Sequence, residues 1–400
     1  MKFPLFIIFL LISININAFD LPESYNTDIN HIYEVSPVRD QKGLGSCWAF
    51  APCGSMEACA IKKYGKAQIL SPLNIVNKNP YPNLSIYKGG NYDKTMAYLF
   101  QLIGPVEEKY DPYKPPYSSP KTQPSPCGYS EDVYILSDDL GGFDEEELNS
   151  VKMAVGIYGG VVVSYFDDER NYYSSDRKNY FCPYTNHSNH QIVIIGWDDS
   201  YSKKHFRHYP KKDGAFLAKG SWGTKINKGF VWVSYEDANL SNAVCYTYSK
   251  VEDVPYKNIL SYVKSSAVDT YFYPKSRDVY GKVLYNNIGC EIKALRAYIP
   301  EKSECKVMLY VDDILKYEDT KEMNWGGYRT FYLDSPVKVE KNNKVAFVIR
   351  FTGKDKYGTL PVEMPDNDYR AVLKKRCNFV SWNGRDWKEA PYNIGVGILY

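Results

Sequence analysis

The sequence lacks several features that would assign it to common functional classes. No Cys-x-x-Cys pair occurs among the nine cysteines, so a structural zinc site is not indicated. Basic and acidic residues nearly balance, and a formal net charge of +2 gives no electrostatic reason to expect a nucleic-acid partner. No apolar run approaches the ~20 residues of a membrane-spanning helix. We therefore expect no metal, no cofactor, no nucleic-acid partner and no membrane span.

The first 18 residues have the pattern of a secretory signal peptide. Lys2 is the only charged residue before an apolar run from Leu5 to Ile12, and the small residue Ala18 suits a cleavage site. The many cysteines fit an oxidising export route. We therefore expect a signal peptide at residues 1–18 and a secreted, extracellular protein, or one delivered to a lysosome- or vacuole-like compartment.

Cys47 is the clearest candidate for a nucleophile. It begins a segment whose pattern predicts a helix over residues 47–64. A helix N-terminus favours a thiolate through its unpaired N–H groups and its dipole. Gln41, six positions upstream, carries an amide that is suited to hold a developing oxyanion together with the Cys47 backbone N–H.

A cysteine nucleophile needs a base, and His190 is the best placed of the five histidines. It precedes an apolar, β-branched run at residues 191–197 that is typical of a buried strand. A histidine at the start of a rigid strand is well placed to face a cleft. His205 and His208, by contrast, lie in a segment rich in lysine and arginine that is typical of a solvated loop. We therefore expect His190 to accept the proton of the Cys47 thiol.

The string Gly-Ser-Cys-Trp-Ala-Phe that contains Cys47, preceded by Gln41, resembles the nucleophile region of papain-like cysteine peptidases. His190 follows within the ~130–150 residues that separate the two catalytic residues in that family. The resemblance extends from about Leu21 to Lys250. It implies a peptidase domain with a helical lobe, a β lobe and a groove between them. It also implies that Cys47 is the nucleophile, His190 the base and acid, and Gln41 a member of the oxyanion hole.

Other residues are assigned through the same resemblance. Gly89 and Gly90 match paired glycines that bind the backbone of an extended peptide, and Trp222 matches a tryptophan that shields the catalytic histidine. Gly220 departs from the family pattern, because an asparagine usually stands there and orients the histidine. Since glycine has no side chain for that task, we expect activity at a reduced rate.

Cys182 and Cys245 match the positions of a disulfide in the family. Together with the expected export route, the resemblance implies that these two cysteines are bridged.

Hydrophobic patterns predict the elements of this first domain. Helices are expected at residues 47–64 and 92–101. Strands are expected at residues 160–165, 191–197, 214–219 and 229–235.

From about residue 251 the pattern changes to short strands. Alternating apolar residues at 305–311 and 345–351 predict half-buried strands. Further strands are expected at 269–273, 291–299, 328–333, 378–382 and 395–399, which favours a β-sandwich. The order of features resembles a lectin-like domain that follows some secreted papain-like peptidases. Trp382, Trp387 and Tyr271 are candidates for stacking on sugars, with packing in the core as the alternative.

We therefore predict an α+β fold, with a signal peptide at 1–18, a papain-like peptidase domain at 19–250 and a lectin-like β-sandwich domain at 251–400. The predicted function is a secreted thiol peptidase that acts on peptide or protein substrates, with carbohydrate as a further candidate partner of the C-terminal domain. The alternative is a catalytically degenerate papain-fold protein that presents a glycan- or surface-binding β-sandwich.

Overall fold

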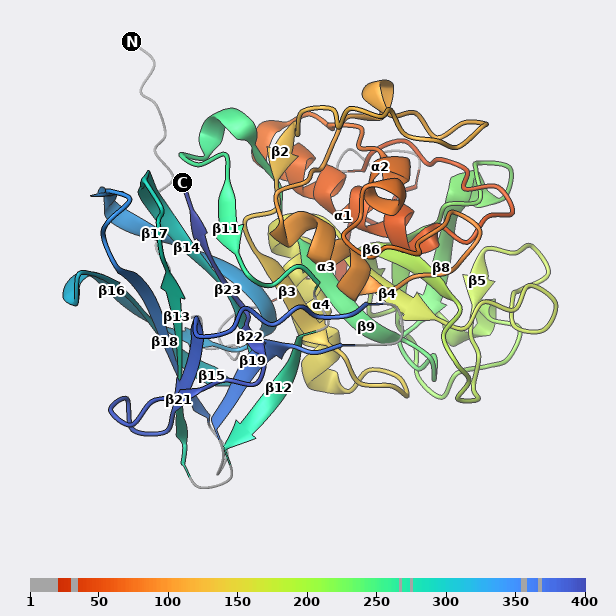
Figure 1. Ribbon diagram of the computed structural model, residues 1–400. Coiled ribbons are helices and arrows are strands. Elements are labelled where there is room, and N and C mark those ends of the chain that lie inside the picture. Colours follow the sequence, from red (N-terminus) through yellow and green to blue (C-terminus); the bar gives the residue numbers. More distant parts are fainter. Residues whose placement is uncertain (1–20, 30–34, 266–267, 274–275, 354–357, 366–368) are drawn as a thin grey trace, which may run out of the picture.

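The computed structural model describes residues 21–29, 35–265, 268–273, 276–353, 358–365 and 369–400 (Figure 1). The expected signal peptide lies outside the described residues. Within them, no helix has both the length and the apolar character needed to cross a membrane.

Helix α1 (Cys47–Tyr64) is the centre of the first half of the chain, and it has the bounds that the sequence predicts. Every residue from Cys47 to Ala60 is buried, as expected of a helix that is apolar on all sides. The helix ends at Gly65, whose φ of 70° lets its N–H bond to the Ile61 carbonyl. It packs on one side against α2 (Pro72–Asn77) and α3 (Tyr92–Phe100) and on the other against strands of the β lobe.

The β lobe is an antiparallel sheet with one added parallel strand at its edge. Its order is β3-β9-β4-β6-β7-β8-β5. The bounds are β3 (Val133–Ser137), β4 (Val161–Tyr165), β5 (Asn179–Tyr180), β6 (His190–Asp198), β7 (Ala215–Lys219), β8 (Phe230–Ser234) and β9 (Ser241–Tyr246). The four strands expected here are confirmed as β4, β6, β7 and β8. Helix α4 (Glu145–Tyr158), which packs on this sheet, was not predicted.

The second half of the described chain is all β, which confirms the expected sandwich. Its first sheet has the order β16-β15-β18-β13-β20-β21 and a smaller one has the order β12-β19-β22, while β11, β23, β14 and β17 extend the sheet of the β lobe. The bounds are β11 (Ile259–Ser261), β12 (Val268–Tyr273), β13 (Asp278–Tyr285), β14 (Cys290–Ile299), β15 (Ser303–Val311), β16 (Ile314–Met323), β17 (Gly326–Val339), β18 (Val345–Gly353), β19 (Gly358–Glu363), β20 (Asn378–Ser381), β21 (Lys388–Glu389), β22 (Asn393–Ile394) and β23 (Val396–Leu399).

Short elements complete the fold. They are β1 (Ser24–Tyr25), β2 (Gly128–Tyr129), β10 (Ser249–Lys250) and the 3-10 turns Glu108–Tyr110, Lys203–His205, Asn227–Gly229 and Val251–Asp253.

One sheet joins the two halves of the chain. Strand β17 pairs with β3, with Gly327 opposite Tyr134 and Tyr328 opposite Val133. Gly327 has a φ of 103°, and a Cβ there would lie 2.1 Å from the Val133 carbonyl oxygen, so only glycine fits this pairing. The halves therefore share backbone hydrogen bonds and not only side-chain contacts (Figure 1).

Arg296 fastens this junction from within. Its guanidinium group is fully buried and donates hydrogen bonds to the carbonyl oxygens of Leu99, Phe100 and Ser130 at 3.3–3.4 Å. Two of these carbonyls belong to the last turn of α3, which an α-helix cannot satisfy internally. A side chain of β14 thus caps a helix of the first half of the chain.

The expected disulfide between Cys182 and Cys245 is wrong, because both residues are free thiols. Cys182 follows β5 at the edge of the sheet, and its thiol donates to the Tyr184 carbonyl oxygen at 3.2 Å. The backbone of Cys182 hydrogen-bonds to Asp237 and Ala238, in the loop before β9, whereas Cys245 lies further along β9 (Ser241–Tyr246). A family position matched in sequence does not ensure the geometry that a disulfide requires.

Replacing Arg296 by leucine is expected to lower the free energy of unfolding by about 3 kcal/mol or more, since three buried carbonyl oxygens lose their donor. Chemical denaturation measures the change. Lys338→Leu serves as the control, because Lys338 lies on β17 with a side chain that is 79% exposed, and a surface change of this kind stays within about 0.5 kcal/mol. Equal stability of the two variants would contradict the assigned role.

Candidate active site

A groove of about 380 Å³ lies between the helical lobe and the β lobe. It brings together four of the residues that the sequence singles out: Gln41, Cys47, His190 and Trp222. The remaining lining residues are Gly43, Leu44, Gly45, Asp167 and Asn189.

Cys47 is the first residue of α1, and its side chain meets the groove with 9% exposure. Burial raises the pKa of the Cys47 thiol, while the backbone N–H groups of Gln191 and Trp48 act in the opposite direction. The geometry is that of a thiol that is desolvated and yet surrounded by N–H groups able to favour a negative charge.

His190 is the first residue of β6 and faces the groove from the opposite lobe. Its ring stacks on Trp222, with ring centroids 5.0 Å apart and an angle of 15° between the planes. Burial lowers the pKa of His190 to about 4, so the imidazole is neutral when no opposite charge is near. Its Nε2 atom is buried and has no hydrogen-bond partner.

The space beside Gly220 is open. A Cβ placed on Gly220 would meet only the Gly229 carbonyl oxygen, at 3.5 Å, which is an ordinary van der Waals contact. The backbone of Gly220 has no positive φ, so a residue with a side chain fits there without strain. The glycine is therefore not imposed by local geometry, although it leaves Nε2 of His190 without an amide partner.

Gln41 is held firmly at the edge of the groove. Its Oε1 accepts a hydrogen bond from the Ser221 hydroxyl at 2.5 Å, and its Nε2 donates to the Leu44 carbonyl oxygen at 2.7 Å. A primary amide has two N–H donors, so one remains for a ligand in the groove. Ser221 was not singled out in the sequence, although it directly precedes Trp222.

The two glycines expected to bind substrate differ from each other, and neither lines the groove itself. Nothing lies within 4 Å of a Cβ placed on Gly89, which leaves its backbone open to a ligand. A Cβ on Gly90 would lie 2.4 Å from the ring of Trp48, so packing inside the lobe requires this glycine. Both are adjacent to the groove through Gly45, whose Cβ position lies 3.2 Å from the Gly89 nitrogen.

Two further groove residues, Asp167 and Asn189, belong to the wall around His190. In the pairing of β4 with β6, Tyr165, the last residue of β4, lies opposite His190. Asp167 comes two residues after Tyr165 and is thereby brought close to His190 in the groove. The sequence offers no signal for Asp167, because its position depends on this register.

Beneath the groove lies a cluster of buried charges around Glu57, which is fully buried in α1. Its carboxylate accepts hydrogen bonds from Ser36, from Arg39 at 2.8 Å and from the Leu70 backbone N–H at 2.9 Å. Lys219, at the end of β7, lies 3.9 Å away, and burial lowers its pKa to about 8. The carboxylate thus links the N-terminal segment, α1 and β7.

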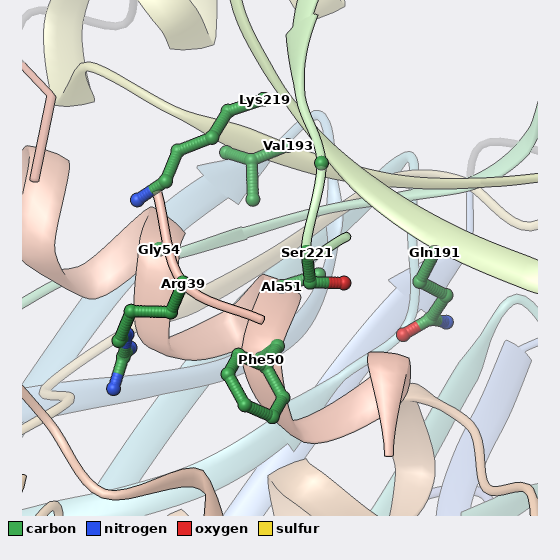
Figure 2. Close-up of a pocket in the computed structure, with 9 residues that line it drawn as sticks. Arg39, Phe50, Ala51, Gly54, Gln191, Val193, Lys219 and Ser221 are labelled. Carbon is green, nitrogen blue, oxygen red and sulfur yellow. The ribbon is translucent and has the colours of Figure 1, made fainter. Parts of the chain in front are cut away.

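Figure 2 shows a cavity beside this cluster, with Arg39 and Lys219 on one side and Gln191 on the other. Its volume of about 10 Å³ is close to the size needed for one water molecule. The Oε1 atom of Gln191, which helps to line the cavity, is buried without a hydrogen-bond partner.

In the C-terminal half, the aromatic residues proposed to contact sugars differ in how far neighbouring side chains cover their rings. Trp387 is covered by Lys282, whose ammonium nitrogen lies 4.0 Å from the ring centroid. Trp382 is 36% exposed and lies near Lys388. Tyr271 is in β12, but its side chain lies outside the described residues.

In the part of the chain that the structure describes, no three histidine, cysteine, aspartate or glutamate side chains gather as a metal-binding group. The groove therefore offers a thiol, an imidazole and amide donors as its reactive groups.

Comparison with protein families gives two matches. The model for "Papain family cysteine protease" matches residues 21–251, and the model for "Lectin like domain" matches residues 262–395.

Several curated proteins are similar to the first half of the chain. A cathepsin L-like peptidase of Aedes aegypti is 27% identical over 221 residues, which are 54% of this chain and 61% of that protein. Cathepsin K of Mus musculus is 28% identical over 212 residues, which are 51% of this chain and 58% of that protein. The match thus spans less than two thirds of these relatives.

Among solved structures, the cysteine protease and lectin-like domains of Cwp84, a surface layer associated protein of Clostridium difficile, have a TM-score of 0.78 with this chain at 22% identity. The match covers 95% of this chain and 89% of that one. A second structure of Cwp84, after propeptide cleavage, gives the same TM-score and identity, covering 94% of this chain and 98% of that one. The two-part architecture is therefore shared across nearly the whole chain.

Loss of the Glu57 charge is expected to destabilise the fold strongly. In Glu57→Gln, Arg39 and Lys219 stay buried without the carboxylate between them, and breaking a buried ion pair in this way costs about 3–5 kcal/mol. The control is Asp40→Asn, which removes an exposed pair with Lys42 and is expected to cost at most about 1 kcal/mol. Urea denaturation distinguishes the two, and similar losses in both variants would contradict the role of Glu57.

Proposed function

Because the chain belongs to the papain family of cysteine proteases, whose model matches residues 21–251, we propose that it hydrolyses peptide bonds through the thiol of Cys47. The observation that carries this proposal is that Cys47 and Gln41, from the stretch that leads into α1, line the same groove as His190 of β6. A groove of this size between two lobes suits a peptide or protein substrate.

In the proposed reaction, His190 takes the thiol proton while the Cys47 sulfur attacks the carbonyl carbon of the substrate. The carbonyl oxygen becomes an oxyanion that accepts hydrogen bonds from the Gln41 amide and the Cys47 backbone N–H. His190 then gives its proton to the leaving amine, and a thioester with Cys47 remains. Water, deprotonated by the neutral His190, cleaves the thioester and restores the thiol.

Burial shapes the first step. It raises the pKa of Cys47 and lowers that of His190, so a single charge on either group is disfavoured. Transfer of the proton creates both charges together, and their mutual attraction in a site of low polarity opposes the cost of burying each charge. The proton transfer therefore requires the two groups to be in contact.

The C-terminal half and the location of the protein enter the proposal through other features. The match to a lectin-like domain supports carbohydrate as a further partner, with Trp382 as the exposed aromatic candidate. The apolar segment at residues 5–12 supports export through a signal peptide at residues 1–18. The division into domains at 19–250 and 251–400 is part of the same proposal.

A second candidate function is a binding protein with a degenerate papain fold. It is favoured by one observation, the Nε2 of His190 that is buried without a partner in a chain that has Gly220 in place of the family's asparagine. Turnover by Cys47 separates the two functions.

We expect residues 19–400 to form a covalent adduct on Cys47 with a thiol-directed epoxide and to cleave members of a peptide library. Cys47→Ala should lower turnover by at least ~10³-fold, because the nucleophile is lost. Cys290→Ala, which removes a thiol from the C-terminal half, is the control and should keep the rate. Equal turnover by the native chain and Cys47→Ala, without an adduct, would favour the binding protein.

Restoring the missing amide is expected to speed the reaction. Gly220→Asn should raise kcat by roughly tenfold, equivalent to ~1.4 kcal/mol, with little change in KM, because the amide orients His190 and does not touch substrate. Gly220→Ala adds the Cβ without the amide and should give no gain. If Gly220→Asn folds as stably as the native chain without raising kcat, another group already orients His190.

A further inference from the structure

Asp167 is an acid in the groove that the reaction described above does not use. Its Oδ1 atom is buried and accepts no hydrogen bond. Its backbone is fixed on both sides by the Asn189 side chain, which accepts from the Asp167 N–H at 2.7 Å and donates to the Asp167 carbonyl oxygen at 3.0 Å. Since Asn189 directly precedes His190, the carboxyl group is held at a constant place beside the reacting groups.

No cation in the described surroundings neutralises this carboxyl group. Arg177 is the cation whose charge acts on it, but Arg177 is paired with Glu169 at 3.0 Å and lies over the ring of Tyr173. The hydroxyl groups of Tyr165 and Tyr173, 3.1 Å apart, are its other polar neighbours, and their hydrogen bonding to the carboxyl group lowers its pKa against the larger effect of burial. Burial raises the pKa of Asp167 to about 6, so the group is mostly a carboxylate at neutral pH.

The charge of Asp167 acts on the Cys47 thiol. Burial is the main cause that raises the pKa of this thiol, and the negative charge of Asp167 raises it further. A positive charge placed against Asp167 would offset this contribution, so the group that fills the vacant acceptor also favours the thiolate.

We propose that Asp167 is a specificity-determining residue that selects peptides with a lysine or arginine side chain next to the scissile bond. An ammonium or guanidinium group supplies both the missing hydrogen-bond donor and the missing positive charge. A neutral side chain of the same length leaves the carboxylate without a neutralising cation, and an acidic one adds repulsion. The inference rests on the proposed function, because it concerns the substrate of the same groove.

The test compares fluorogenic peptides that differ only by lysine or norleucine, and by arginine or citrulline, at each position flanking the cleaved bond. Enzyme concentration is set by titration of Cys47 with the epoxide. We expect the native chain to prefer the cationic peptide at one of these positions by about tenfold or more in kcat/KM. In Asp167→Asn the ratio of kcat/KM between the cationic and the neutral peptide should fall to about one.

The matched control is Asp168→Asn, which removes the same charge from the next residue of the chain; Asp168 contacts Arg170 and Asn171 and does not line the groove. It should keep the preference. An enzyme that reacts with the epoxide and cleaves peptides, but shows no cationic preference or keeps it in Asp167→Asn, overturns this inference and leaves the proposed function standing. Absence of both the adduct and cleavage overturns the proposed function and this inference with it. The native profile needs no variant, so the outcome does not depend on the folding of Asp167→Asn.

Discussion

The carboxylate of Glu57 is the constraint on which the geometry of the groove depends. It is fully buried, and it joins the segment that leads to Gln41, the helix that begins at Cys47 and the strand that ends at Lys219. The first two pieces are neighbours in the chain and carry Gln41 and Cys47, while the third comes from a distant part and leads to Trp222, which also lines the groove. A buried ion pair contributes little net stability, but it accepts only one arrangement of its partners. The ion pairs of Glu57 thus help to fix the shape of the groove.

The groove contains two buried polar atoms without a hydrogen-bond partner, Nε2 of His190 and Oδ1 of Asp167, and Oε1 of Gln191 is in the same state in a second cavity. Other such atoms occur elsewhere in the described chain, but these three are titratable or amide groups that line a cavity, where a ligand can satisfy them. The charged groups around Glu57, in contrast, all have partners, and they hold the neighbouring segments in place.

Local patterns were sufficient to predict the elements that carry the reaction. Helix α1 and strand β6 were predicted because apolar periodicity and a helix start are encoded within a few residues. Features that depend on the pairing of distant segments were not predicted correctly. The position of Asp167 follows from the register of β4 on β6, the joining of β17 to β3 links residues far apart, and the expected bridge between Cys182 and Cys245 failed for the same reason.

The pairing of β17 with β3 also bears on how the chain can be divided. A fragment that stopped near residue 250 would leave one side of β3 without its partner strand and the end of α3 without the cap from Arg296. An open strand edge is a template for pairing with other chains, and natural proteins avoid exposing it. The first half of the chain therefore draws a strand partner and a helix cap from the second half, so a cut near residue 250 removes contacts that belong to the first half's own elements.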